Sequence, residues 1–122
     1  MIFPAIGVAT TGTNAAIVYT LTGNTHFPSV AVSRVSSVAQ ASSIGDVRPG
    51  KDVLDDFAWY FFGTPRWGDY SAAVGDGRTV YLATEYIQNP SCSDDVFLFD
   101  PTCGGTRGEA SNWGTGLVRV NV

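Results

Sequence analysis

The sequence predicts an all-β fold made of antiparallel sheets. Glycine occurs 14 times and proline 6 times among 122 residues, and helix formers are scarce. Val, Thr, Ser and aromatic residues are plentiful, which is typical of short strands joined by turns. Two apolar runs, Tyr70–Val74 and Thr79–Ile87, flank the turn Gly75–Gly77. Because Gly-Asp-Gly readily adopts the positive φ angles of a tight reversal, we expect a β-hairpin over this stretch.

The second strand of this hairpin is mostly apolar on both faces. Alternation along a strand places Val80, Leu82, Thr84 and Tyr86 on one side, and Tyr81, Ala83, Glu85 and Ile87 on the other. A sheet with one face in water would alternate apolar with polar residues. We therefore expect this strand to be covered on both faces.

The N-terminal half predicts three strands. The apolar run Phe3–Ala9 leads through the turn Thr10–Asn14 into the strand Ala15–Thr22. The strand Pro28–Val35 follows, with its proline at the start, where a missing N–H costs least. These three runs predict a second antiparallel unit.

The segments between and after these strands are less regular. Residues Ser36–Lys51 predict a connection with one weak strand at Ile44–Val47. Asp52–Phe62 could begin as a helical turn and end as a strand, and its five aromatic residues are expected to fill a core or an interface. A loop containing both cysteines, Asn89–Asn112, precedes the last strand, Trp113–Val122.

Two similar units emerge, and repeated antiparallel units that are apolar on both faces are typical of the blades of a β-propeller. We therefore expect residues 1–122 to be a single propeller segment of about two four-stranded blades. The first blade spans 1–50, a connection spans 51–65, and the last blade spans 66–122 with its Cys loop at 89–112. Because a ring needs about 4 to 8 blades, three explanations stay open: part of a longer propeller, which we favour, a ring completed by several copies, or a small sandwich.

Ordered motifs carry a family resemblance. The N-terminal part of the chain contains FPAIGVATTG, YTLTG and FPSVAV in this order. The C-terminal part contains RWGDYSAAV, a strand ending in ATEYI, a CGGTR loop and NWGT. This set resembles the C-terminal blades of large secreted bacterial proteins with sialidase-like, BNR-type β-propellers. The resemblance implies a secreted, extracellular bacterial protein. The Asp-box SxDxGxTW is absent, and DGRTVYLA at 76–83 echoes its hairpin only in part.

Charge limits the partners. The formal net charge is −4 and the pI is about 4.6. Because no basic stripe is present to collect phosphates, neither nucleic acid nor an anionic membrane is expected as a partner. No apolar run approaches the roughly 20 residues that span a bilayer. The expected partners are the remaining blades of a longer chain, further copies of this chain, or glycans.

Cys92 and Cys103 are predicted to form a disulfide, since an isolated pair in a secreted protein usually does. A redox pair would need a CxxC spacing, and zinc would need more ligands than two Cys and His26 supply. No metal site and no cofactor are therefore expected. Ca²⁺ is the one ion that the clustered acidic residues could bind, although they form no DxDxDG ladder and favour a turn-forming role. These residues are Asp52, Asp55, Asp56, Asp94, Asp95 and Asp100.

Candidate ligand-binding residues lie in and beside the hairpin: Arg66, Trp67, Asp69, Tyr70 and Glu85. Sialidases, as the resemblance implies, use an arginine cluster, a Tyr nucleophile paired with a Glu base, and an Asp acid. Glu85 and Tyr86 cannot form that pair, because adjacent strand residues face opposite sides. No catalytic residue is assigned, and a structural ion pair of Glu85 with Arg66 or Arg119 is favoured over catalysis.

Aromatic residues suggest binding to sugars. Trp59, Tyr60, Trp67, Tyr70, Tyr86 and Trp113 could stack on sugar rings if several are exposed. We expect a non-catalytic propeller segment with a structural or a glycan- or protein-binding role. The alternative is part of a sialidase-like glycoside hydrolase whose other catalytic residues lie on blades outside this chain.

Overall fold

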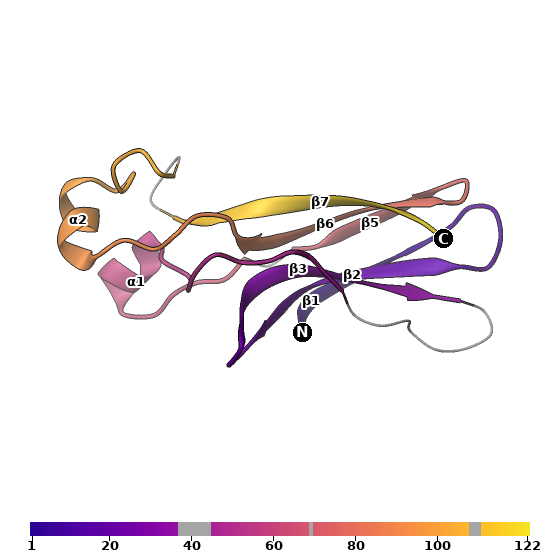
Figure 1. The fold of residues 1–122 in the computed structure, drawn as a ribbon, viewed down its shortest axis with the longest axis horizontal. Coiled ribbons are helices and arrows are strands. Elements are labelled where there is room, and N and C mark those ends of the chain that lie inside the picture. Colours follow the sequence, from indigo (N-terminus) through magenta and orange to yellow (C-terminus); the bar gives the residue numbers. More distant parts are fainter. Residues whose placement is uncertain (37–44, 69, 108–110) are drawn as a thin grey trace.

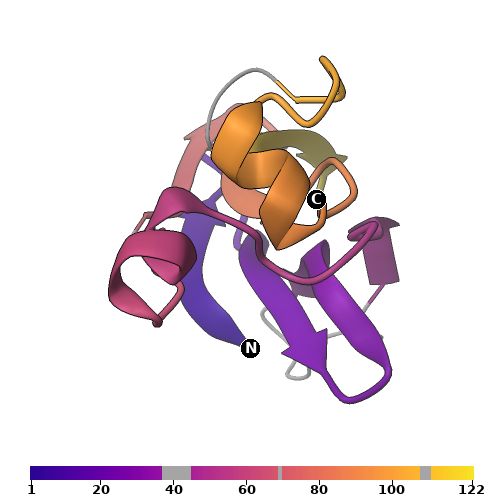
Figure 2. The same ribbon diagram turned by 90° about the vertical axis from the view of Figure 1, so that its left-hand side faces the viewer.

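Two antiparallel β-sheets and two short helices make up the computed structural model, which describes residues 1–36, 45–68, 70–107 and 111–122. The first sheet has the order β1-β2-β3-β4, and the second has the order β5-β6-β7. The strands are β1 (Ile2–Val8), β2 (Ala15–Gly23), β3 (His26–Val35), β4 (Gly45–Arg48), β5 (Ala72–Asp76), β6 (Thr79–Ile87) and β7 (Trp113–Asn121), and the helices are α1 (Phe57–Phe62) and α2 (Asp94–Phe99). The all-β prediction is confirmed. The two sheets form two layers with both helices at one end (Figures 1 and 2).

The predicted strands form two sequential meanders. In the first, β1 pairs with β2, β2 with β3 and β3 with β4, always antiparallel. In the second, β5 and β6 form the predicted hairpin, but its turn is at Gly77 and Arg78, because Gly75 and Asp76 are paired residues of β5. Of the Gly-Asp-Gly motif, Gly77 alone has a positive φ, 58°. The strand β3 begins two residues before Pro28, so the proline lies just inside it. The weak strand predicted at 44–47 is β4, one residue later.

The core lies between the two sheets. Buried side chains of both layers form it: Ala16, Val18, Val30, Val32, Val80, Leu82, Tyr86 and Val120. Glycines allow the layers to approach closely. The α-carbon of Gly75 lies against the carbonyl of Val8, so that a Cβ would clash with backbone. The side of the sandwich formed by β1 and β5 is therefore tightly closed.

Hydroxyl groups join the sheets at one place inside the core. Thr20 is fully buried, and its Oγ1 donates to the carbonyl of Glu85 at 2.7 Å. Thr84 lies 3.2 Å from Thr20 Oγ1 and 2.6 Å from Ser71 Oγ. Because each buried hydroxyl finds a partner, this polar cluster fixes the register between layers without leaving a desolvated group unpaired.

The ambiguous segment 52–62 ends as a helix and not as a strand. Asp56 is the N-cap of α1, and its Oδ1 accepts from the Trp59 N–H at 3.0 Å. Gly63 ends the helix in the left-handed region, with φ 67°, as glycine commonly does. Four of the five aromatic residues do not fill the core, since Phe57, Trp59, Phe61 and Phe62 are exposed and Ala58 is the buried residue of α1. That these side chains fill an interface stays a prediction.

The second helix lies inside the segment predicted as a plain loop. Residues Asp94–Phe99 form α2, with two acidic side chains in its first turn, where the helix dipole favours negative charge. Phe97 is buried, whereas Leu98 and Phe99 are exposed. Within the described residues, neither helix is long and apolar enough to cross a membrane.

The outer face of the second sheet is uncovered in the part of the chain that the structure describes. Val74, Tyr81 and Leu117 share this face and are 62%, 45% and 70% exposed. The expectation that β6 is covered on both faces is therefore met only on the side facing the first sheet. The second sheet has three strands among the described residues, one fewer than the blades predicted from sequence.

Candidate functional site

A buried ion pair organises the helical end of the molecule. Arg107 Nη1 donates to Asp55 Oδ2 at 2.9 Å, and the two side chains are 0% and 5% exposed. The same nitrogen lies 3.2 Å from the Asp55 carbonyl, and Arg107 Nε donates to the Pro101 carbonyl at 3.0 Å. Since a buried charge is costly unless it is paired and hydrogen-bonded, these contacts explain how both charges are tolerated there.

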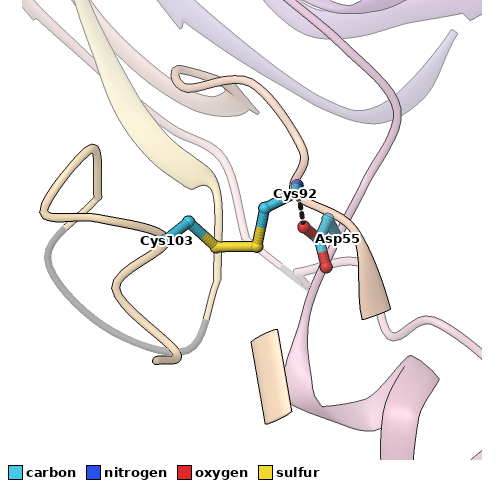
Figure 3. Close-up of side chains that lie close together, drawn as sticks. All are labelled: Asp55, Cys92 and Cys103. Atoms are coloured by element: carbon cyan, nitrogen blue, oxygen red, sulfur yellow. Dashed lines mark hydrogen bonds between the residues drawn. A yellow bond between two sulfur atoms is a disulfide. The ribbon is translucent and has the colours of Figure 1, made fainter. Parts of the chain in front are cut away.

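The predicted disulfide between Cys92 and Cys103 is confirmed, with Cα atoms 6.0 Å apart. Figure 3 shows the bridge beside Asp55, whose Oδ2 accepts from the Cys92 N–H at 2.8 Å. Arg107 Nη2 lies 3.6 Å from Cys92 Sγ. The bridge and the ion pair therefore fasten the Cys loop to the segment before α1.

One metal-like cluster appears at this place, and its donors do not fit a metal. Ligand atoms of Asp55, Cys92 and Cys103 lie within 4.8 Å of one another. The two sulfurs are bonded to each other, so neither is the thiolate that a metal requires. The Arg107 guanidinium also occupies one carboxylate oxygen. In the disulfide form the cluster is a structural junction.

Aromatic rings continue the network toward α1. Tyr60 stacks on Phe97 with ring centroids 3.7 Å apart, and the Arg107 guanidinium lies 5.1 Å from the Phe97 centroid. The Tyr60 hydroxyl lies 3.4 Å from the Cys92 carbonyl. Burial, followed by the neighbouring Asp55 carboxylate, raises the pKa of Tyr60 well above its usual value of 10.0. Tyr60 is therefore a neutral hydroxyl at ordinary pH.

A cleft of about 360 Å³ opens beside this network. It is lined by Val53, Leu54, Asp55, Trp59, Tyr60, Pro65, Ser91, Cys92 and Asp94. Trp59 is 47% exposed and presents an aromatic surface, and Asp94 is exposed as well. The lining thus combines apolar rings with hydroxyl and carboxylate groups, which suits a ligand with both an apolar face and hydroxyls.

Three of the acidic residues considered for Ca²⁺, Asp52, Asp56 and Asp100, have local structural partners. Asp52 Oδ2 accepts from the Ser91 N–H and hydroxyl, and the hydroxyl contact contributes most to lowering the pKa of Asp52. Asp56 caps α1 and also accepts from the Arg66 N–H. Asp100 accepts from the Thr102 N–H at 3.0 Å and from the Gly104 N–H at 2.8 Å. These contacts are the turn-forming bonds that short acidic side chains favour.

Of the five ligand-binding residues predicted from sequence, the structure describes four. Arg66 and Tyr70 are exposed, and Trp67 and Glu85 are half-buried. The Glu85 carboxylate packs against Gly68, which brings the 66–68 segment beside β6. Asp69 lies outside the described residues. None of the described four lines the cleft beside Trp59, although Pro65 does.

Sequence reasoning named Trp59 and Tyr60 as possible sugar-stacking residues and missed the ion pair beneath them. The pair joins positions 52 apart, and no local spacing marks it. The available signal was an arginine inside an otherwise acidic, Gly-rich Cys loop, which needs a carboxylate if it is buried. Asp55 and Asp56 both precede the aromatic run, and the sequence does not show which of the two carboxylates pairs with Arg107.

Comparison with family models, with curated proteins and with solved structures gives no match for this chain. Its function is therefore inferred from its own residues.

Proposed function

We propose that this chain is a non-catalytic segment of an extracellular, sialidase-like β-propeller protein and that it binds glycans at the cleft beside Trp59. The observation that carries the proposal is the composition of that cleft. A half-exposed indole, that of Trp59, lines the same cleft as Tyr60, Ser91 and Asp94. The C–H face of a sugar ring packs on an aromatic surface, and its hydroxyls need donors and acceptors at the rim.

The cleft is held open by rigid supports. Tyr60 stacks on Phe97, the Asp56 carboxylate holds the backbone N–H of Trp59, and the Cys92–Cys103 bridge fixes Cys92 in the lining. A pre-organised cleft of this kind loses little conformational entropy when it binds a ligand. We therefore expect the cleft to bind a sugar ring without a large rearrangement of its lining residues.

The groups in the cleft are better suited to binding than to catalysis. Asp55 is paired with Arg107 and with the Cys92 N–H. Tyr60 is protonated at neutral pH, and its raised pKa makes the phenolate still harder to form, whereas a tyrosine nucleophile would need its proton removed by a nearby base. A neutral phenol and a paired carboxylate can still position hydroxyl groups. This chemistry supports a glycan-binding role and gives no support for a hydrolase site here.

The uncovered outer face of the second sheet supports a place within a larger β-sheet protein. Ala72, Ala73, Val74, Tyr81, Leu82, Ala83 and Leu117 line a shallow apolar depression of about 200 Å³ there. Contiguous exposed apolar patches on a sheet usually mark a contact surface. We interpret this face as the surface against which a neighbouring blade packs. The disulfide is consistent with an oxidising, extracellular location.

The test is a glycan array followed by titration calorimetry of the best hit with the wild-type chain and two tryptophan variants. Trp59→Ala is expected to weaken glycan binding at least about tenfold, because it removes the stacking surface. Trp113→Ala is the matched control: its indole is 45% exposed, close to the 47% of Trp59, but it lies on β7 and does not line the cleft.

Loss of binding in Trp59→Ala alone supports the proposal. Equal loss in both variants would place the site elsewhere, and an array without hits at millimolar glycan would contradict glycan binding by this chain. Turnover of a fluorogenic glycoside that stops in Asp55→Asn, with folding intact, would instead favour a hydrolase.

A further inference from the structure

The strand β7 lies at the side of the sandwich away from β1 and β5. This strand has nine residues, Trp113–Asn121, and pairs with β6 from Thr79↔Asn121 to Ile87↔Trp113 without an irregularity. It is the edge of the three-stranded sheet. Natural edge strands are usually shortened, bulged, charged or interrupted by proline, because a long flat edge invites pairing with another strand. Apart from one arginine, β7 has none of these protections.

The direction of the free backbone groups follows from two hydrogen bonds at the ends of β7. Asn112 O accepts from the Gln88 N–H, and the Val122 N–H donates to Arg78 O. Backbone groups alternate between the two edges of an antiparallel strand. Even-numbered residues therefore direct their N–H and C=O groups at β6. Those of Thr115, Leu117, Arg119 and Asn121 point to the open edge, where no partner is seen among the described residues.

A cleft of about 410 Å³ adjoins this edge. Its lining comes from both layers: Val32 and Arg34 on β3, Gly45 and Val47 on β4, and Val118, Arg119 and Val120 on β7. In the first sheet a further strand, β4, lies beside β3. In the second sheet, as far as the structure describes the chain, no strand lies beside β7 on its outer side. The cleft therefore lies where a fourth strand beside β7 would pack over β4.

The lining specifies the side chains of such a strand. Val47 is 47% exposed and Val118 is half-buried, so apolar surface is left uncovered. Arg34 and Arg119 are exposed, and in the part of the chain that the structure describes neither forms an ion pair. Side chains of one strand alternate between faces. Apolar residues at alternate positions would cover the valines, and carboxylates at the positions between them, on the outer face of the sheet, would complement the guanidinium of Arg119.

We propose that the open edge of β7 and the adjoining cleft bind an extended segment of a partner polypeptide, which adds to the second sheet as a fourth antiparallel strand. Its main chain pairs with the free groups of 115–121. Its side chains alternate apolar residues with residues that include a carboxylate near Arg119. Backbone pairing supplies affinity in this recognition mode, and the alternate side chains supply specificity. This surface is separate from the cleft beside Trp59 and does not depend on the proposed glycan binding.

The probe is a synthetic peptide of the same length as β7, Thr-Val-Glu-Val-Thr-Val-Glu-Val-Thr, titrated into the ¹⁵N-labelled chain and followed by two-dimensional NMR. We expect the amide signals of Thr115, Leu117, Arg119 and Asn121 to shift and to gain protection from hydrogen exchange. Two control peptides, one scrambled to remove the alternation and one with proline at the central position, are expected to bind at least about tenfold more weakly.

Proline variants of β7 separate strand addition from folding. Leu117→Pro removes one N–H of the open edge while leaving the bonds to β6, its side chain is 70% exposed, and Gly116 before it has no Cβ to clash with the proline ring. We expect this variant to fold and to lose peptide affinity about tenfold or more. Val118→Pro removes a bond to β6 and is expected to unfold or to destabilise the chain strongly.

A charge reversal provides a variant that leaves the backbone unchanged. Arg119→Glu is expected to weaken binding of the glutamate peptide and to strengthen binding of a peptide with lysine in place of glutamate, each about tenfold. Amide shifts confined to other strands, absence of binding at millimolar peptide, or equal affinity of Leu117→Pro and the wild type would overturn the proposal. Dimerisation of the free chain that Leu117→Pro abolishes would also overturn it, since a second copy would then be the occupant.

Discussion

Arg107 in the Cys loop and Asp55 before α1 form a buried ion pair of 2.9 Å across 52 positions of sequence. The pair lies under the Cys92–Cys103 bridge, and Asp55 also accepts from the Cys92 N–H. A covalent link and a charged link thus hold the same two segments together. Two residues of this junction, Asp55 and Cys92, line the cleft that we propose for glycans.

Removing the arginine is expected to be strongly destabilising. Arg107→Met leaves the Asp55 carboxylate buried without its counter-charge, which typically costs about 3 to 5 kcal/mol. Urea denaturation measures the change in the free energy of unfolding. Arg78→Ala, at an exposed position, is the control and should stay within about 0.5 kcal/mol. A loss below about 1 kcal/mol for Arg107→Met would mean that the pair is solvated like a surface salt bridge.

Breaking the disulfide is expected to loosen the helical end without unfolding the sheets. The bridge closes a loop of 11 positions, so Cys92→Ser combined with Cys103→Ser should cost about 2 to 3 kcal/mol by the chain-entropy relation. Far-ultraviolet circular dichroism should keep its β signature, because the core between the sheets contains neither cysteine. Loss of that signature at 25 °C would contradict this expectation.

We expect substitution of Gly75 to lower the stability of the protein, because the two sheets approach each other closely at this residue. Gly75→Ala places a methyl group against the Val8 carbonyl, and the backbone there must shift. Overpacking of this kind typically costs about 1 to 3 kcal/mol. Gly23→Ala is the matched control, since nothing lies within 4 Å of its added Cβ. Thermal unfolding should separate the two variants, and equal midpoints would show that the sheets are farther apart at Gly75.

We expect the folded protein to lose stability at alkaline pH because of Tyr60. Its folded pKa is raised by burial and by Asp55 above the usual value of 10.0, so the fold favours the neutral hydroxyl. The stabilisation is complete below pH 10 and is lost as the pH rises above 10.0 towards the folded pKa. Tyr60→Phe should flatten the decline of the unfolding midpoint between about pH 9 and 11.5. Tyr81→Phe, on the outer face of β6, should leave the decline unchanged.

Local chemistry in the sequence was enough to predict the strands and their pairing. Gly77 specifies the β5–β6 turn, runs rich in apolar and β-branched residues specify β2, β6 and β7, and two cysteines 11 positions apart specify the disulfide. These signals act between near neighbours, through backbone conformation and the period of two along a strand. They fix each meander by itself.

Only the tertiary structure decided how the meanders meet and what the connecting segments do. The run from Phe57 to Phe62 is apolar enough for a strand, but the Asp56 cap and the position of Gly63 make it a helix at the surface. Faces of β6 that look alike in sequence differ in burial, because the first sheet covers one of them. The partner of Arg107 could not be predicted from the sequence, because several carboxylates carry the same charge. The packing of segments 52 positions apart brings Asp55, and not another carboxylate, next to the guanidinium. Burial and long-range pairing depend on the whole chain, so no local pattern encodes them.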